Sequence, residues 1–438
     1  TNVTTATLLM TAGSTTTSTT GIGSASNAIE TDVATLALRS GSAGAFVLES
    51  NALSIDAVSS TINRVNAQGT TATQSDSGED ANSGGILVVQ AGGTLTINGG
   101  TASAASGINA TGNVLLKTTN SGNIALATGL TSAGNVSLNA AGDVTQSADG
   151  DITLTGSGMT LDVLASGDIT MNATAVSQTK QGSVRYQATS GAIALGQINT
   201  ADAGNVGTSG VALVAGTNIA DADADNGSVL TNVTTATLLM TAGSSLTSTT
   251  GIGSASNVIE TSVDTLALQG GTSGSFVTES NALSIDSVST SVNRVGTLGT
   301  TAAQTDSGED ANSGGALVLQ AGGTLTVNGG SASATSGINA TGNVLLKTSG
   351  ATSNIALNAA LTSAGDVSLN AAGNMTQGID GDITLSAAGK TLDVLANGSI
   401  SMNAGAVSQT NLGSVRYQSS TGDIALGQIS KIGRASCR

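Results

Sequence analysis

The chain has 438 residues, of which 60 are glycine and 39% are hydrophobic, but only 1% are aromatic and none is proline, histidine or tryptophan. Compact globular cores use large aromatic side chains to fill the space between layers, so this composition favours a narrow core of stacked aliphatic residues, as in a solenoid. The formal net charge is −16, from 28 acidic and 12 basic residues, and it argues against nucleic acid as a partner.

Short β-strands are predicted along the whole chain, and no segment is predicted to be helical. A recurring theme is Gly followed by Asn or Asp and then by alternating aliphatic and polar residues. Six such runs are Gly112-Asn-Val-Leu-Leu, Gly122-Asn-Ile-Ala-Leu, Gly134-Asn-Val-Ser-Leu, Gly142-Asp-Val-Thr-Gln, Gly150-Asp-Ile-Thr-Leu and Gly167-Asp-Ile-Thr-Met. Period-two alternation is typical of strands with one face inward. We expect the Gly-Asn and Gly-Asp pairs to form turns, because both residue types tolerate the left-handed backbone region.

Short strands joined by tight turns can form two arrangements, a row of β-sandwich domains or a parallel β-helix. A row of β-sandwich domains is disfavoured, since these usually carry a central aromatic plug and prolines in their loops. A right-handed parallel β-helix needs neither, and the absence of proline suits it, because almost every backbone N–H is then used by the next rung. Rungs of roughly 20–25 residues stacked at ~4.8 Å predict an elongated all-β solenoid with about ten rungs per repeat unit.

The chain contains a long internal repeat. Residues 1–14 recur unchanged at 231–244, and the match continues down the chain until one residue is inserted near Ala351. We therefore predict two β-solenoid repeat units, residues 1–230 and a truncated copy at residues 231–430. A chain that begins at Thr1 without an initiator Met or a signal peptide is expected to be an internal fragment.

Three acidic segments are candidate calcium sites. One segment, Asp76, Glu79 and Asp80, recurs in the second copy as Asp306, Glu309 and Asp310, and the third contains Asp221, Asp223 and Asp225. Three carboxylates within five residues suit a hard cation. For the first two segments we favour a solvated loop that protrudes from the solenoid over a calcium site. In the third, Asn226 and Asn232 stand where a calcium loop has glycine and a bidentate glutamate.

An enzymatic centre is not predicted, and neither is a cofactor or a metal-ligating residue. Histidine is missing and the only cysteine is Cys437, so two of the residue types most used in catalysis contribute nothing. Arg64 and Arg185 reappear as Arg294 and Arg416. Arg185 and Arg416 each stand beside a tyrosine on a predicted strand, and a solvated outward face accounts for these two. Some parallel β-helices act on polysaccharides, but such an enzyme requires Arg64, Arg185 and several carboxylates to meet in one groove.

The last eight residues, 431–438, differ in composition from everything before them. Translated in one frame, a common sequencing adapter encodes the string Ile432 to Arg438, and a lysine codon supplies the preceding bases. We therefore interpret residues 431–438 as a non-native tail on an environmental or draft-assembly reading frame. Without this tail the chain has no cysteine, which excludes a disulfide framework and a cysteine-based zinc site.

The Gly-Asn-Val-x-Leu and Gly-Asp-Ile-x-Leu runs, with stretches such as Ala91-Gly-Gly-Thr-Leu-Thr-Ile97, resemble filamentous-haemagglutinin-type bacterial adhesins. The resemblance implies a right-handed parallel β-helix in a secreted or cell-surface protein that leaves the cell through a partner outer-membrane pore. It also implies host or matrix surface ligands, carbohydrate among them. The function expected is a structural stalk or fibre segment. The alternatives are a carbohydrate- or calcium-binding repeat module and a polysaccharide-active enzyme. No run is long enough to span a membrane.

Overall fold

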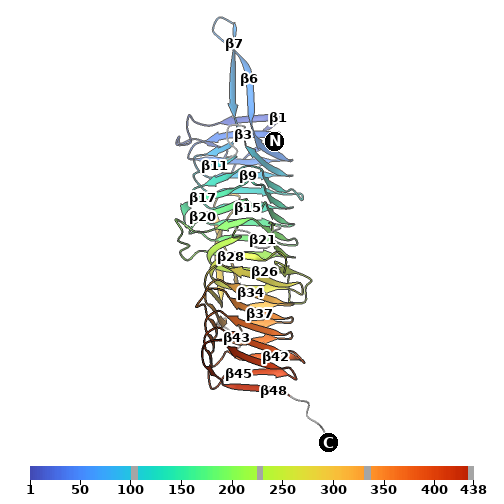
Figure 1. The fold of residues 1–438 in the computed structure, drawn as a ribbon. Helices are drawn as coiled ribbons and strands as arrows, with labels where there is room; N and C mark the ends of the chain where they lie inside the picture. The colour runs from blue at the N-terminus through green and yellow to red at the C-terminus, as the bar shows by residue number, and fades with distance from the viewer. Residues whose placement is uncertain (100–106, 224–229, 330–336, 433–438) are drawn as a thin grey trace. The chain divides into compact units, whose positions relative to one another are not determined.

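The computed structural model describes residues 1–99, 107–223, 230–329 and 337–432 and is an all-β parallel β-solenoid of about 16 turns (Figure 1). The described residues contain no helix, and hence none long and apolar enough to cross a membrane. The predicted parallel β-helix is confirmed, while its right-handed coiling stays a prediction.

The described residues of the first sequence repeat contain 25 strands. They are β1 Val3–Thr11, β2 Gly21–Ile22, β3 Ile29–Ser40, β4 Gly44–Glu49, β5 Leu53–Asp56, β6 Val58–Val65, β7 Thr71–Gly78, β8 Ala81–Ser83, β9 Leu87–Ala91, β10 Leu95–Gly99, β11 Ile108–Ala110, β12 Val114–Thr118, β13 Ile124–Leu126, β14 Leu130–Ser132, β15 Val136–Ala140, β16 Val144–Gln146, β17 Ile152–Ser157, β18 Leu161–Ala165, β19 Ile169–Met171, β20 Val176–Lys180, β21 Val184–Ala188, β22 Ile193–Leu195, β23 Gln197–Asn199, β24 Gly210–Ala215 and β25 Ile219–Asp221.

The second repeat continues the same order. Its strands are β26 Val233–Ala242, β27 Gly251–Ile252, β28 Ile259–Gly270, β29 Gly274–Glu279, β30 Leu283–Asp286, β31 Val288–Val295, β32 Thr301–Gly308, β33 Ala311–Ser313, β34 Leu317–Ala321, β35 Leu325–Gly329, β36 Ile338–Ala340, β37 Val344–Thr348, β38 Ile355–Leu357, β39 Leu361–Ser363, β40 Val367–Ala371, β41 Met375–Gln377, β42 Ile383–Ala388, β43 Leu392–Ala396, β44 Ile400–Met402, β45 Val407–Asn411, β46 Val415–Ser419, β47 Ile424–Ala425 and β48 Gln428–Ile432. Of the interpreted tail, Lys431 and Ile432 end β48, and the rest lies outside the described residues.

Strands of successive turns stack in parallel and in register. Along one side of the coil Leu87 pairs with Val114, Val114 with Val136, and Val136 with Leu161. These side chains point inward and are buried, so each turn repeats the aliphatic layer of the one before it. Since the backbone groups between stacked strands are used in pairing, proline has no suitable place.

Turns are longer on average than the sequence predicts. About 16 turns in 438 residues is roughly 27 residues per turn, so each repeat has fewer than the expected ten rungs. The reason is that two hairpins, β6–β7 and β31–β32, form separate two-stranded sheets outside the stacked sheet and add residues without adding a turn.

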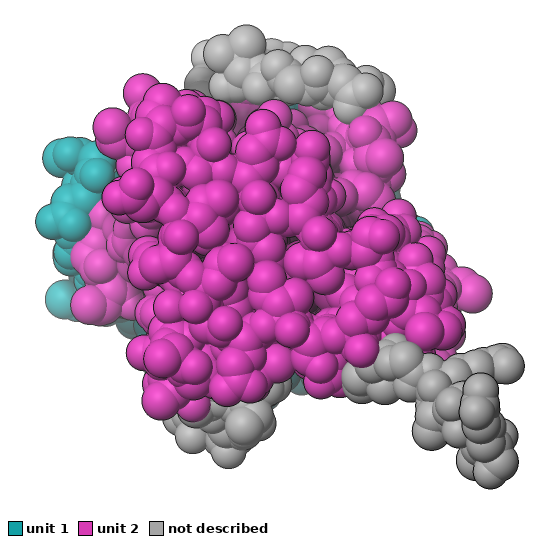
Figure 2. Space-filling model, turned by 60° about the horizontal axis from the view of Figure 1, so that its bottom comes forward, with its two compact units in different colours: residues 1–191, 196–205, 291–304 teal, residues 192–195, 206–290, 305–438 magenta. Residues whose placement is uncertain are grey.

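The described chain divides into two compact units, shown in different colours in Figure 2. Unit 1 consists of residues 1–191, 196–205 and 291–304, and unit 2 of residues 192–195, 206–290 and 305–438. The units differ from the sequence repeats in two ways. Residues 192–195 and 206–230 come from the first repeat but belong to unit 2, and residues 291–304 come from the second repeat but pack within unit 1.

The Gly-Asn and Gly-Asp pairs stand at the corners, as predicted, but for a different physical reason. Gly134 and Gly142 do not have a positive φ. Instead, a Cβ on Gly134 would lie 2.5 Å from the backbone nitrogen of Asn113 in the neighbouring turn. The residue after each glycine stacks too, since the Asn123 side chain accepts a hydrogen bond from the Asp143 N–H at 2.8 Å. Close approach of turns, and not left-handed geometry, therefore requires these glycines.

Candidate functional site

One line of side chains on the outer face of unit 1 is unusually well buried. It consists of one outward-facing residue from each of six stacked strands, and each of these strands pairs with the next. We call this line the first outward column: Phe46, Val88, Leu115, Ser137, Asp162 and Arg185. All six residues are buried, although residues at this position in a strand point away from the aliphatic core.

The second repeat contains the same line of residues in the same pairing. We call it the second outward column: Phe276, Val318, Leu345, Ser368, Asp393 and Arg416. None of these six is buried. The six residue types are identical in the two columns, so the difference in burial comes from what lies over the column.

The first outward column is covered by the tip of the β31–β32 hairpin, residues 291–304. Val295 is 2% exposed and forms a hydrophobic cluster with Phe46, Val88 and Leu115. The backbone N–H of Val295 donates to Ser137 Oγ at 2.8 Å, and that of Asn293 donates to Thr160 Oγ1 at 2.8 Å. The tip therefore makes both apolar and directional contacts with the outer face of unit 1.

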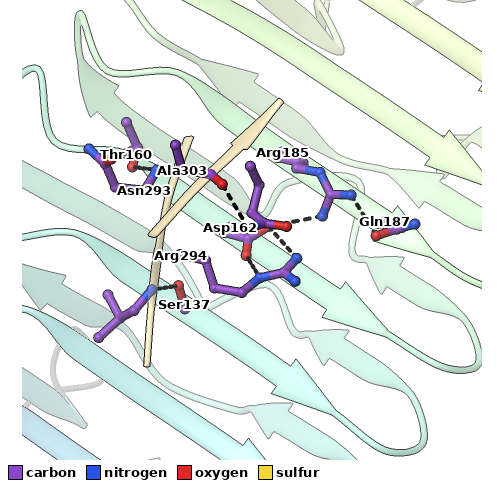
Figure 3. Close-up of polar contacts among 10 residues, drawn as sticks. Ser137, Thr160, Asp162, Arg185, Gln187, Asn293, Arg294 and Ala303 are labelled. Carbon is purple, nitrogen blue, oxygen red and sulfur yellow. Dashed lines mark hydrogen bonds and ion pairs between the residues drawn. The ribbon is translucent and has the colours of Figure 1, made fainter. Parts of the chain in front are cut away.

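Three charged groups meet under this hairpin (Figure 3). Asp162 on β18 accepts hydrogen bonds from Arg294 Nε at 2.5 Å and from Arg185 Nη1 at 3.2 Å. Arg185 also donates to Gln187 Oε1 at 2.6 Å. The Asp162 side chain is only 1% exposed, so one buried carboxylate is shared between two guanidinium groups. Such a group is costly to bury unless it is paired and hydrogen-bonded.

The corresponding pair in the second repeat is open to solvent. Arg416 donates to both oxygens of Asp393, at 2.8 and 2.6 Å. Its side chain is 58% exposed, against 8% for Arg185. The hydrogen bonds and charge of Asp393 raise the pKa of Arg416, and the arginine stays a cation. This pair has the first two members of the buried cluster and lacks the third.

The β6–β7 hairpin, residues 58–78, corresponds in sequence to the β31–β32 hairpin. Its strands pair antiparallel over their full length, from Val58 with Gly78 to Val65 with Thr71. Val65 is 65% exposed, whereas its counterpart Val295 is 2% exposed. Arg64, the counterpart of Arg294, is exposed as well. This hairpin therefore presents to solvent the residues that its counterpart buries.

The structure brings the predicted acidic segments together only in part. Asp76 is on β7, and Asp76, Glu79 and Asp80 line a hollow that also contains Arg39. A cation of the protein itself thus lies among these carboxylates, and Gln269 holds this position in the second repeat. In residues 1–99, 107–223, 230–329 and 337–432 no group of three or more carboxylate, cysteine or histidine side chains is placed to hold a metal ion.

The third acidic segment is also occupied by protein contacts where it is described. Asp221 Oδ1 accepts hydrogen bonds from Asn232 Nδ2 at 2.7 Å and from the Asp223 N–H at 3.1 Å. Asp225 lies outside the described residues. The recurring segment Asp306, Glu309 and Asp310 follows the tip of the second hairpin, with Asp306 on β32.

The arginines are not arranged as a polysaccharide-active site requires. Arg185 meets one carboxylate, Asp162, and the arginine beside it is Arg294, not Arg64. The prediction of a solvated outward face is wrong for Arg185, because the second hairpin covers it, and right for Arg416. Sequence reasoning missed Asp162. The available signal was the pair of apolar residues Val292 and Val295, which a solvated hairpin does not need.

Buried acidic groups elsewhere have structural partners. Glu279 is buried, and desolvation raises its pKa, a property also found in catalytic acids. Its two carboxylate oxygens, however, accept hydrogen bonds from Thr261 Oγ1 at 2.6 Å and from the Val263 and Asn281 N–H groups at 2.9 and 2.8 Å. Glu49 makes the same set of contacts in the first repeat. Both glutamates therefore tie neighbouring turns together.

The geometry as a whole is a repeated lateral face that is covered in one repeat and open in the other. Its polar groups hold strands in place. No family model, no curated protein and no solved structure matches the chain.

Proposed function

We propose that the chain is a structural stalk or fibre segment of a large secreted or surface-displayed bacterial adhesin. The observation that carries this proposal is the seating of residues 291–304 on the first outward column. A hairpin from the second repeat thereby reinforces the outer face of the first, which makes the turns it crosses resist separation. Repetition with such a clasp increases length while keeping stiffness.

The contacts of the hairpin are suited to stiffness. It adds one apolar cluster, two backbone hydrogen bonds and one ion pair across turns that are otherwise held by strand pairing and by the stacked aliphatic core. The contacts engage different turns, at Leu115, Ser137 and Asp162. Bending or fraying those turns requires all of these contacts to break together.

The bacterial surface setting rests on the resemblance of the Gly-Asn-Val-x-Leu runs to filamentous-haemagglutinin-type adhesins. In that setting the partners are an outer-membrane export pore and ligands on host or matrix surfaces, with carbohydrate among them. The acidic, proline-free composition suits an exposed solenoid, since net charge keeps long repetitive proteins from aggregating.

Small-angle scattering of the dilute chain, compared with a chain that carries a third, in-frame copy of residues 1–230, tests the structural role. At ~4.8 Å per turn, the added copy is expected to increase the maximum dimension by about 40 Å. A maximum dimension that stays constant when the copy is added contradicts a stalk. Limited proteolysis of both chains is the control for folding.

A further inference from the structure

The first hairpin, residues 58–78, is similar in sequence to the β31–β32 hairpin but covers neither outward column in this structure. Its residues Ile62, Arg64 and Val65 correspond to Val292, Arg294 and Val295. Ile62 is 54% exposed, whereas Val292 is 1% exposed. Two large apolar side chains beside an arginine on an exposed two-stranded ribbon are a typical contact surface.

The second outward column is the matching receptor. Leu345 and Val318 stand in the positions of Leu115 and Val88, which pack against Val295. Asp393 stands in the position of Asp162 and already pairs with Arg416, the counterpart of Arg185. An arginine arriving at Asp393 completes the arrangement of one carboxylate between two guanidinium groups.

We propose that the first hairpin of one molecule docks on the second outward column of another copy of this chain. The occupant is specified by the molecule itself, because residues 291–304 already occupy the equivalent column in unit 1. In the intermolecular contact Arg64 pairs with Asp393, and Val65 packs against Leu345 and Val318. The hydroxyl of Ser368 accepts a hydrogen bond from the Val65 N–H, as Ser137 does from Val295.

The dimensions of the two surfaces agree. Each arm of the first hairpin has 8 residues, which at ~3.3 Å per residue gives about 26 Å. The second outward column crosses six stacked strands, from β29 to β46, and at ~4.8 Å between strands it is about 24 Å long. The ribbon therefore reaches along the whole column.

Each molecule has one such hairpin and one open column, so the contact is heterologous and builds chains of molecules rather than closed pairs. The inference stands apart from the proposed function. The chain could be a fibre segment without making this contact, and it could make this contact in a protein of another function. Scattering of the dilute chain tests the fibre segment, and the association experiment below tests the contact.

Sedimentation equilibrium of the full chain at increasing concentration tests the contact through two single charge reversals, R64E and D393R. The wild-type chain is expected to self-associate, and each variant alone is expected to lose roughly tenfold or more in association constant, because a like-charged pair replaces the ion pair. Asp149→Arg, a reversal at an exposed turn residue, is the matched control and is expected to associate as the wild type does.

Mixing the two variants gives the sharpest outcome. The D393R molecule keeps a wild-type hairpin and the R64E molecule keeps a wild-type column. An equimolar mixture is therefore expected to recover association, and the two reversed side chains, which have opposite charges, add a second attractive pairing. A wild-type chain that remains monomeric, as an occupant from the same polypeptide would leave it, overturns the proposal. So does association that neither reversal weakens, or a mixture that fails to recover it.

Discussion

The two hairpins of the chain have closely similar sequences and opposite surroundings. In β31, Val292 and Val295 are buried, and Arg294 pairs with Asp162. In β6, the equivalent residues are exposed along nearly the whole strand. Both ribbons nevertheless form the same kind of separate two-stranded sheet. The ribbon is thus set by local sequence, and its burial by whether a column lies beneath it.

This comparison shows that both copies of a repeat can have the residues for a contact although only one copy makes that contact. An isolated two-stranded hairpin is marginally stable in water. The apolar residues of such a ribbon are best explained by the surface that covers them. The same reasoning applies to the columns, where Leu115 is buried and Leu345 is half-buried although their strands have the same sequence, Val-Leu-Leu-Lys-Thr.

The largest effect is expected from removing the shared carboxylate. Asp162→Ala leaves the buried Arg185 and the partly buried Arg294 without their common partner, and we expect the seating of residues 291–304 to weaken by about 3–5 kcal/mol. Hydrogen exchange at the Asn293 and Val295 amides measures this directly, because both donate to side chains of unit 1.

The matched control is Asp393→Ala, which removes the equivalent carboxylate from an exposed pair. No measurable change in the exchange of the Asn293 and Val295 amides is expected, since surface ion pairs contribute little to stability. Equal effects of the two variants would mean that burial under the hairpin does not distinguish the two repeats.

Much of the fold follows from the sequence in physical terms. The alternation in runs such as Gly134-Asn-Val-Ser-Leu predicts the strands, and the absence of proline and large aromatics predicts the parallel solenoid. The reason for the glycines was wrong, because the approach of Gly134 to the neighbouring turn depends on which turns stack. Pairing between residues that are far apart in sequence is not visible in a local pattern.

The candidate site was less predictable. The alternation of its strand places Arg185 on the outward face, and the sequence therefore predicts that it is solvated. Its burial depends on Arg294 and Val295, more than one hundred residues later in the chain. The internal repeat held a usable signal, since Val65 and Val295 are the same in both copies at a position where a solvated ribbon gains nothing from valine.

A smaller effect is expected from glycine substitutions in the two hairpin turns. Gly299 and Gly69 have positive φ, +76° and +71°, so an alanine at either costs ~1–2 kcal/mol in backbone strain. Only at Gly299 does the new Cβ also meet a neighbour, 2.7 Å from Ile86 Cγ2, while at Gly69 nothing lies within 4 Å. The clash adds about 1 kcal/mol.

Hydrogen exchange of each hairpin gives the change in its local free energy of opening from the wild-type chain to Gly299→Ala or Gly69→Ala, and the two changes are then compared. Because the strain is common to both, subtracting one from the other isolates the contact with Ile86. Identical values for the two variants would show that residues 291–304 are not seated against Ile86 in solution.

The smallest effect concerns an ionisable residue that only the second repeat has. Asp366 stands where the first repeat has Asn135. Its carboxylate accepts hydrogen bonds from the Thr391 N–H at 2.9 Å and from Lys390 Nζ at 3.2 Å. These contacts, with the Thr391 backbone bond foremost, lower the pKa of Asp366. Since the folded pKa is the lower one, this stabilisation is present above the unfolded pKa, near 4, and is lost as the pH falls through the folded pKa.

The protection of the Thr391 amide is therefore expected to fall on acidification below about pH 4, whereas that of the Thr160 amide, which donates to Asn135, changes less. Only a small effect is expected, because exposed ion pairs contribute little to stability. Asp366→Asn, which restores the residue type of the first repeat, removes this pH dependence and leaves a neutral acceptor at the same place. If the Thr391 amide of Asp366→Asn keeps the wild-type pH profile, another carboxylate is responsible for it. The charge of Asp366 then does not explain the difference between this position and Asn135.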